Sequence, residues 1–88
     1  MQSEGENEES RNHGLQPLDA LIESFEYVNG DLVEASTEQL THKQVQKARK
    51  GRRVTSNIQK KILNALRTLR KDHEDETYQV TDLFNYRP

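Results

Sequence analysis

The chain has 88 residues, of which 31% are apolar and 32% are charged, so it can form one small domain with a limited core. It contains no Cys, which excludes disulfides and thiolate metal sites and predicts a reducing compartment, and no apolar run approaches a membrane span of roughly 20 residues. The net charge of -2 hides a segregation of charge, because residues 41–71 hold eleven Lys and Arg and no acid. Such a segment creates a local positive potential, which is suited to an anionic partner.

Residues 1–16 are rich in Glu and nearly free of apolar side chains, so we expect a disordered acidic tail. This tail can simply keep the protein soluble, or it can compete with an acidic ligand for the basic segment. We expect a folded domain over residues 17–71 and a C-terminal tail over residues 72–88.

The first expected helix begins at Pro17, which suits the first turn of a helix, and ends at Asn29-Gly30. Its apolar residues recur at helical spacing and are Leu18, Leu21, Ile22, Phe25 and Val28. A second, short helix is expected over about residues 32–38. Asp31 and Glu34 match a capping box at its start.

The third expected helix covers residues 42–50, and Thr41 with Gln44 forms a second capping box at its start. Val45 and Ala48 are its only apolar residues, so a narrow edge is buried and the helix is stable only when docked. Its other side chains are cations, amides and one imidazole. Lys matches the acceptors of guanine and Gln matches the edge of adenine, which suits a DNA major groove.

Gly51 ends this helix, and Thr55 or Ser56 is the expected N-cap of a fourth helix. A clean apolar stripe follows at Ile58, Ile62, Ala65, Leu66 and Leu69. The free amides at the start of this helix, beside Asn57, could hold a phosphate.

Aromatic residues return in the C-terminal tail, which contains three of the five aromatic residues of the chain. A disordered tail rarely carries them, so we expect this segment to pack on the helices of the same subunit. A dimer contact and a docking peptide for another protein are the alternatives.

From Leu18 to Leu69 the chain resembles a helix-turn-helix of the lambda-repressor-like superfamily. Ala35 and Val45 keep the ten-residue spacing of that family's two-helix unit, and Leu40 takes the apolar place at the end of the turn. The chain departs from the family at the turn, where Gln39 or Glu38 stands in place of the usual Gly. It also departs at Glu34, where the family usually has an apolar residue or Ala.

The part after Gly51 is most similar to the headpieces of the lac-repressor family, in which the recognition helix is followed by the pairs found here as Val54-Thr55, Lys61-Ile62 and Ala65-Leu66. Residues 29–35 are closer to the helix-turn-helix of Fis-like factors. Together these resemblances imply an all-α, compact four-helix domain.

The resemblance also implies roles in binding double-stranded DNA. The residues expected to read bases are His42, Lys43, Gln46 and Lys47, and those expected to touch phosphate are Thr41, Gln44, Lys50, Arg52, Arg53 and Asn57. A single unit of this kind binds weakly, so operator binding would need a homodimer on two half-sites. The expected role is that of a cytoplasmic, nucleoid-associated transcriptional regulator.

The sequence offers no pattern for catalysis. His13, His42 and His73 lie far apart without Cys, so we expect no metal and no cofactor. We also expect no small-molecule substrate and no enzymatic activity, because a core this small leaves little room for a pocket. Two alternatives to the regulator stay open. The basic face and the aromatic tail could serve an RNA- or protein-binding adaptor, similar to an antitoxin, or the domain could bind DNA architecturally without sequence choice.

Overall fold

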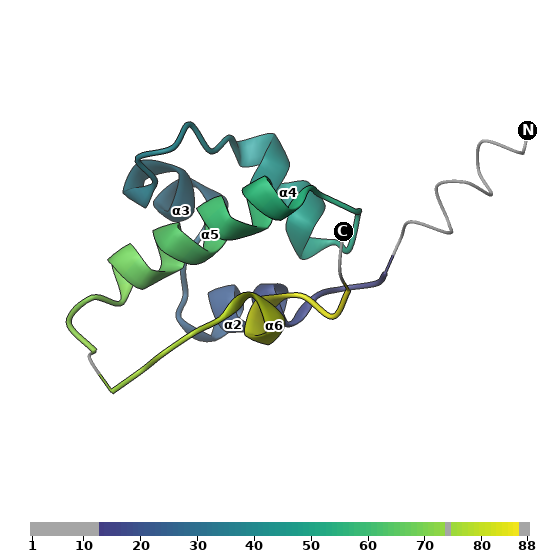
Figure 1. Ribbon diagram of the computed structural model, residues 1–88. Helices are drawn as coiled ribbons and strands as arrows, with labels where there is room; N and C mark the ends of the chain where they lie inside the picture. The colour runs from purple at the N-terminus through teal and green to yellow at the C-terminus, as the bar shows by residue number, and fades with distance from the viewer. Residues whose placement is uncertain (1–12, 74, 87–88) are drawn as a thin grey trace, which may run out of the picture.

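The computed structural model describes residues 13–73 and 75–86, and this part of the chain contains five helices and no strand. The helices are α2 (Pro17–Ser24), α3 (Asn29–Ala35), α4 (His42–Arg49), α5 (Ser56–Leu69) and α6 (Val80–Leu83) (Figure 1). The all-α prediction is therefore confirmed. The expectation of four helices misses α6, a single turn in the C-terminal segment.

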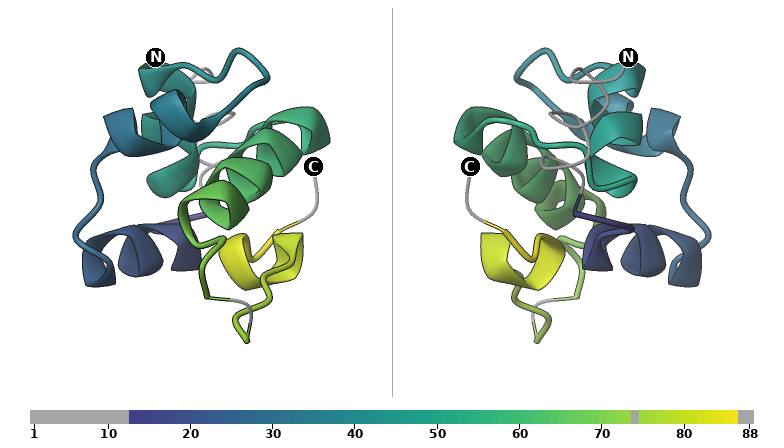
Figure 2. Two further views of the ribbon diagram at one scale, coloured as in Figure 1. Left: turned by 90° about the vertical axis from the view of Figure 1, so that its left-hand side faces the viewer. Right: turned by 90° about the vertical axis from the view of Figure 1, so that its right-hand side faces the viewer.

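The longest helix, α5, lies in the middle of the molecule. It packs against α3 and α4 on one side and against α6 on the other, while α2 packs against α4 and α6. Figure 2 shows α3 and α4 as one pair and α2 and α6 as the other in two further views, with α5 running alongside both. One side of α4 is consequently held by the other layers, and its opposite side is left to solvent.

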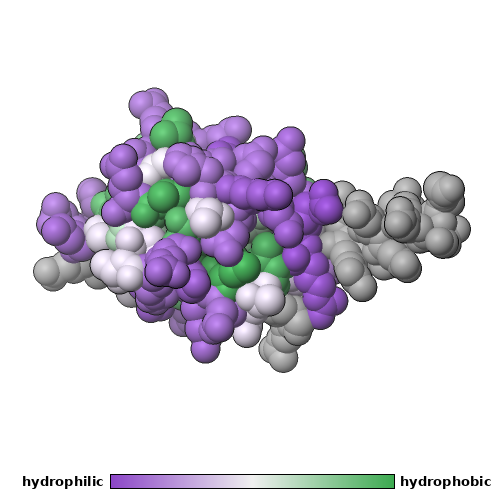
Figure 3. Space-filling model, turned by 90° about the horizontal axis from the view of Figure 1, so that it is seen from above, coloured by the Kyte–Doolittle hydropathy of each residue, from purple (hydrophilic) through white to green (hydrophobic). Residues whose placement is uncertain are grey.

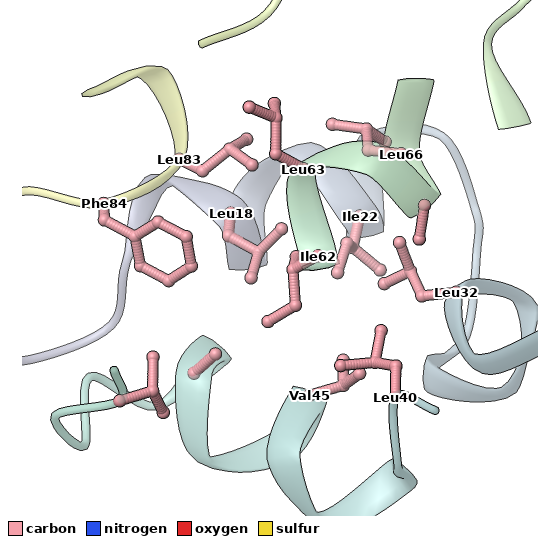
Figure 4. Close-up of a cluster of buried hydrophobic side chains, with 13 residues drawn as sticks. Leu18, Ile22, Leu32, Leu40, Val45, Ile62, Leu63, Leu66, Leu83 and Phe84 are labelled. Carbon is pink, nitrogen blue, oxygen red and sulfur yellow. The ribbon is translucent and has the colours of Figure 1, made fainter. Parts of the chain in front are cut away.

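The core is a single cluster to which every helix contributes (Figure 4). Its buried members are Leu18, Ile22, Leu32, Leu40, Val45, Ala48, Val54, Ile62, Leu63, Ala65, Leu66, Leu83 and Phe84. Leu83 and Phe84 come from the C-terminal segment, which thus packs on the same subunit within the described residues. Burying these side chains removes apolar surface from water, which is the main favourable term in folding a domain of this size.

The first helix is shorter than the apolar spacing predicts, and the predicted role of the Asn29-Gly30 pair is wrong. The helix ends at Ser24, and Glu26 then adopts a left-handed conformation with φ of 62°. Asn29 and Gly30 begin α3 instead of ending α2. The cap of α3 is formed by Asp31, whose carboxylate accepts a hydrogen bond of 2.8 Å from the backbone N–H of Val28, so the expected pairing of Asp31 with Glu34 is wrong.

Residues 36–41 connect α3 to α4 and include a second left-handed residue. Gln39 has φ of 61°, and Leu40 is then buried in the core. Thr41 caps α4 as predicted, because its Oγ1 accepts from the N–H of Gln44 while the Gln44 side chain accepts from the N–H of Thr41, both at 3.1 Å. This reciprocal cap fixes where α4 starts.

The end of α4 is closed by a glycine. Gly51 has φ of 89°, and the N–H groups of Gly51 and Arg52 donate to the carbonyls of Ala48 and Lys47. These two bonds form a Schellman motif, in which the left-handed residue satisfies the last carbonyls of the helix. The prediction that Gly51 ends this helix is confirmed.

Residues 13–16 lie across this end of α4. The N–H of His13 donates to the carbonyl of Gly51 at 2.8 Å, and the N–H of Gln16 donates to that of Arg49 at 3.1 Å. A Cβ at Gly51 would collide with the backbone carbonyl of Gly14. Residues 1–12 of the expected acidic tail lie outside the described residues, whereas Gln16 at its other end is buried.

The two ends of the described chain meet at the connection between α4 and α5. The buried Gln16 side chain donates to the carbonyl of Gly14 and accepts from the N–H of Asn85 at 2.8 Å. Tyr86 stacks on His13 with ring centroids 4.1 Å apart, and its hydroxyl accepts from the N–H of Val54 at 3.0 Å. The end of α4 is therefore held by both ends of the described chain.

An arginine cluster holds the far end of α5. Arg70 forms a bidentate pair with Glu76 at 2.9 and 2.7 Å, and its guanidinium lies 3.9 Å from the centroid of the Phe25 ring. The hydrogen bond from Arg70 lowers the pKa of the Glu76 carboxyl from 4.5 to about 2. Tyr78 donates to the same carboxylate at 3.0 Å, and burial is the main reason that the pKa of its hydroxyl is raised. This cluster ties the C-terminal segment to α5 and to the end of α2.

Candidate nucleic-acid interface

Helix α4 has one buried edge and one exposed face, as its sequence pattern predicts. Val45 and Ala48 are fully buried against the core. The exposed residues of α4 and its C-cap are His42, Lys43, Gln46, Lys47 and Lys50. Figure 3, which looks onto the face that is uppermost in Figure 1, shows mostly hydrophilic residues over this side of the molecule.

An open groove of about 460 Å³ runs along the exposed face of α4. Its lining residues are Leu15, Lys43, Gln46, Lys47, Lys50 and Arg52. Five of the ten residues predicted to bind DNA thus line one surface. They come from successive turns of α4 and the residue after Gly51, so their common orientation follows from helical spacing and from the sharp end of the helix.

The other five predicted residues do not line this groove. Thr41 and Gln44 are joined in the cap of α4, which occupies their side chains with backbone groups. The ring of His42 lies over α3, since a Cβ at Gly30 would stand 3.2 Å from its Cε1 atom. Arg53 is exposed in the connection after α4, and Asn57 is exposed in the first turn of α5.

Among the described residues, no carboxylate lines the groove, and the acids near the end of α4 pair with Arg49. Arg49 Nε donates to Asp19 at 2.7 Å, and Glu23 lies 3.7 Å from another nitrogen of the same guanidinium. Within the described part of the chain, the ammonium groups of Lys43, Lys47 and Lys50 form no hydrogen bond and no ion pair. These three lysines therefore present positive charge that no described residue neutralises, and such charge attracts polyanions.

Two residues at this surface were not predicted from the sequence. Leu15 is 69% exposed at the edge of the groove, within a segment expected to be disordered. Asn29, interpreted as a helix stop, donates from Nδ2 to Gln46 Oε1 at 2.9 Å. Neither could be assigned from sequence, because both contacts depend on how distant segments pack.

Among the described residues, no three His, Asp or Glu side chains lie where they could share a metal ion. None of the helices in that part of the chain combines the length and the apolar character needed to cross a bilayer. Comparison of the chain with protein-family models, with curated proteins and with solved structures finds no significant match.

Proposed function

We propose that this protein is a small DNA-binding transcriptional regulator that inserts α4 into the major groove. The observation that carries the proposal is the groove along α4, where lysines and an amide face solvent together and no carboxylate of the described residues accompanies them. An α-helix fits the width of the major groove, and Lys and Gln donors match the acceptors of base edges there. Arg52, Arg53 and Asn57 lie beyond the end of α4 and are suited to phosphate contacts.

The geometry of α3 and α4 supports the resemblance to a helix-turn-helix. The two helices pack against each other, with Leu32, Leu40 and Val45 buried between them and α5. The left-handed residue of the connection is Gln39, which is one of the two residues, with Glu38, that can stand where the lambda-repressor-like pattern usually has its Gly. The backbone therefore meets the requirement that Gly usually fills, although the side chain differs.

Binding to duplex DNA is tested by titrating the full chain with a random-sequence duplex at several salt concentrations. We expect the binding constant to fall steeply as salt rises, because phosphate contacts release counterions. Backbone amide signals of residues 42–52 should shift in nuclear magnetic resonance spectra. Unmoved signals in α4, or binding that is insensitive to salt, would contradict the proposal.

Selection of duplexes from a random pool then tests sequence reading. An enriched motif supports base contacts by α4, and a palindromic motif supports a homodimer on two half-sites. Binding without an enriched motif would leave architectural binding as the function. Stronger binding to structured RNA than to any selected duplex would favour the RNA-binding alternative.

The adaptor alternative relies on the aromatic residues of the C-terminal segment, and their packing weighs against it. Phe84 is buried, Tyr86 stacks on His13, and Tyr78 is bonded to Glu76. Deletion of this segment would remove Leu83 and Phe84 from the core, so loss of a partner after deletion would report unfolding.

A further inference from the structure

A chain of hydrogen bonds runs from α2 through α4 and α3 to the groove. Arg49 Nε donates to Asp19 Oδ1 at 2.7 Å, Arg49 Nη1 donates to Asn29 Oδ1 at 2.7 Å, and Asn29 Nδ2 donates to Gln46 Oε1 at 2.9 Å. The Arg49 and Asp19 side chains are only 16% and 18% exposed, so the inner end of the chain is shielded from water. Gln46, at its outer end, lines the groove.

The direction of every bond in this chain is set by Arg49. A guanidinium has donors only, so the atom of Asn29 that faces it must be the carbonyl oxygen. The amide nitrogen of Asn29 then faces Gln46, and since that nitrogen can only donate, Gln46 must turn its own carbonyl oxygen toward α3. The Nε2 group of Gln46 is left as the free end of the side chain.

From this network we infer that Asn29 is a specificity-determining positioning residue, which fixes Gln46 as a hydrogen-bond donor toward the bound base. The inference rests on the proposed function and deepens it, because it names what Gln46 can read. A donor matches guanine, which presents the N7 and O6 acceptors in the major groove, and it is mismatched with cytosine, which presents an N4 donor there. Adenine and thymine each offer an acceptor and do not discriminate.

Two near-isosteric variants should reverse this preference. In Asn29→Asp the carboxylate keeps the contact with Arg49 but can only accept, so Gln46 must turn Nε2 toward α3 and present Oε1 to the base. The new carboxylate would stand at the first position of α3, where the helix dipole favours an acid, so the variant should fold. In Gln46→Glu both oxygens are acceptors, and the outward atom again accepts.

The experiment compares duplexes selected from one random pool by the wild-type chain and by these two variants. We expect the wild type to prefer guanine over cytosine by roughly fivefold to tenfold at one position, and we expect both variants to reverse that ratio. Gln46→Ala should abolish the preference at this position and leave the others in place. Asn85→Asp adds the same charge at an exposed site on the C-terminal segment and should change no base preference.

A second measurement reads the network without DNA. In the free protein, one side-chain amide proton of Asn29 should exchange slowly and lose its protection in Gln46→Ala, whereas the Gln46 amide protons should exchange freely. In Asn29→Asp the protection should move to Gln46. Protection already on Gln46 in the wild type would overturn the inference at its structural step.

The outcomes separate this inference from the proposed function. Selection that enriches a motif, with the same base preferred by the wild type, Asn29→Asp and Gln46→Glu, would overturn the role of Asn29 and leave DNA binding intact. Selection that enriches nothing would overturn both, because no preference would exist for Asn29 to set. The reversed ratio together with the exchange pattern would establish the inference.

Discussion

Two groups among the cations of residues 41–71 have different surroundings. Where the helices pack together, the side chains of Arg49 and Arg70 are mostly shielded from water, and each lies 2.7 Å from a carboxylate oxygen. Along the groove, the exposed Lys43, Lys47 and Lys50 have no such partner within the described residues. Arginine suits the first setting because its planar fork forms several fixed bonds, and lysine suits the second as a mobile point charge. The same kind of charge thus serves packing in one region and is left available to a ligand in the other.

The largest expected effect comes from Gly51→Ala, which acts on the covered side of α4 and changes no charge. The substitution would force a left-handed alanine and a collision with Gly14, so we expect a loss of about 2–4 kcal/mol in the free energy of unfolding. Urea unfolding followed by circular dichroism measures it. Gly14→Ala is the matched control, since φ is 77° there but nothing lies within 4 Å of the added Cβ. Equal losses in the two variants would mean that the close approach does not matter.

The exposed side is tested by the double variant in which Lys43 and Lys47 become Ala. We expect the dissociation constant for a selected duplex to rise about tenfold or more. The slope of its logarithm against the logarithm of salt concentration should fall by up to about 2 if both lysines contact phosphate. Stability should stay within about 0.5 kcal/mol of the wild type, because surface substitutions rarely do more.

The control for this variant is the replacement of Lys60 and Lys71 by Ala, which removes the same charge from exposed positions that do not line the groove. It should weaken binding much less. Equal weakening by both double variants would mean that net charge alone drives binding and that the groove has no special role.

The ion pair between Arg70 and Glu76 should make the free energy of unfolding depend on pH. A carboxyl whose pKa is lower in the folded than in the unfolded chain stabilises the fold above its unfolded pKa, and this contribution disappears as pH falls through the folded value. For Glu76 that window runs from about 4.5 down to about 2. In Glu76→Gln we expect a lower urea midpoint at pH 7 and a shallower decline of the midpoint within this window.

Glu34→Gln removes an exposed acid of α3 and should keep the wild-type decline. A wild-type pH profile in Glu76→Gln would show that the pair with Arg70 contributes no net stability. Within the described part of the chain the lysines of the groove meet no carboxylate, so the same measurement contrasts the two regions directly.

The smallest expected effect is a gain in stability, from the substitution Gln39→Gly. Gln39 holds a left-handed conformation, which costs an ordinary residue about 1–2 kcal/mol, and Gly avoids that cost while increasing the entropy of the unfolded chain. We expect Gln39→Gly to raise the free energy of unfolding by about 0.5–1 kcal/mol. Gln39→Ala keeps the strain and should bring no gain. A loss of stability in Gln39→Gly would mean that the Gln39 side chain contributes more than its backbone costs.

The sequence predicts α4 and α5 closely because their signals are local. Thr41 with Gln44, Thr55 before the apolar stripe, and Gly51 as a stop all act within a few residues, and all are found in these roles. The stripe itself is incomplete, because Gln59 and Leu63 are also buried. A helix packed between two layers buries a wider face than one apolar stripe predicts.

The region before α4 is predicted poorly because tertiary contacts decide it. Asn29-Gly30 has the composition of a helix end, yet Asn29 begins α3, where it bonds to Arg49 and Gln46. Gln16 is a polar residue in a segment that the sequence predicts to be disordered. It is nevertheless buried, because its side-chain amide bonds to the backbone of Gly14 and of Asn85 near the two ends of the described chain. Such roles depend on partners 17 to 69 residues away in sequence, which no local pattern encodes.

The two ends of the described chain meet beside the end of α4, which has a consequence for changing the order of the helices along the chain. With Gln16 Oε1 only 2.8 Å from the Asn85 nitrogen, a short linker could join the neighbourhood of residue 86 to that of residue 13 without disturbing the packed layers. New termini could then be opened among residues 36–39, most of which are solvent-exposed. A circular permutant of this kind should keep the same helical layers, with the chain reordered so that α4 becomes its first helix.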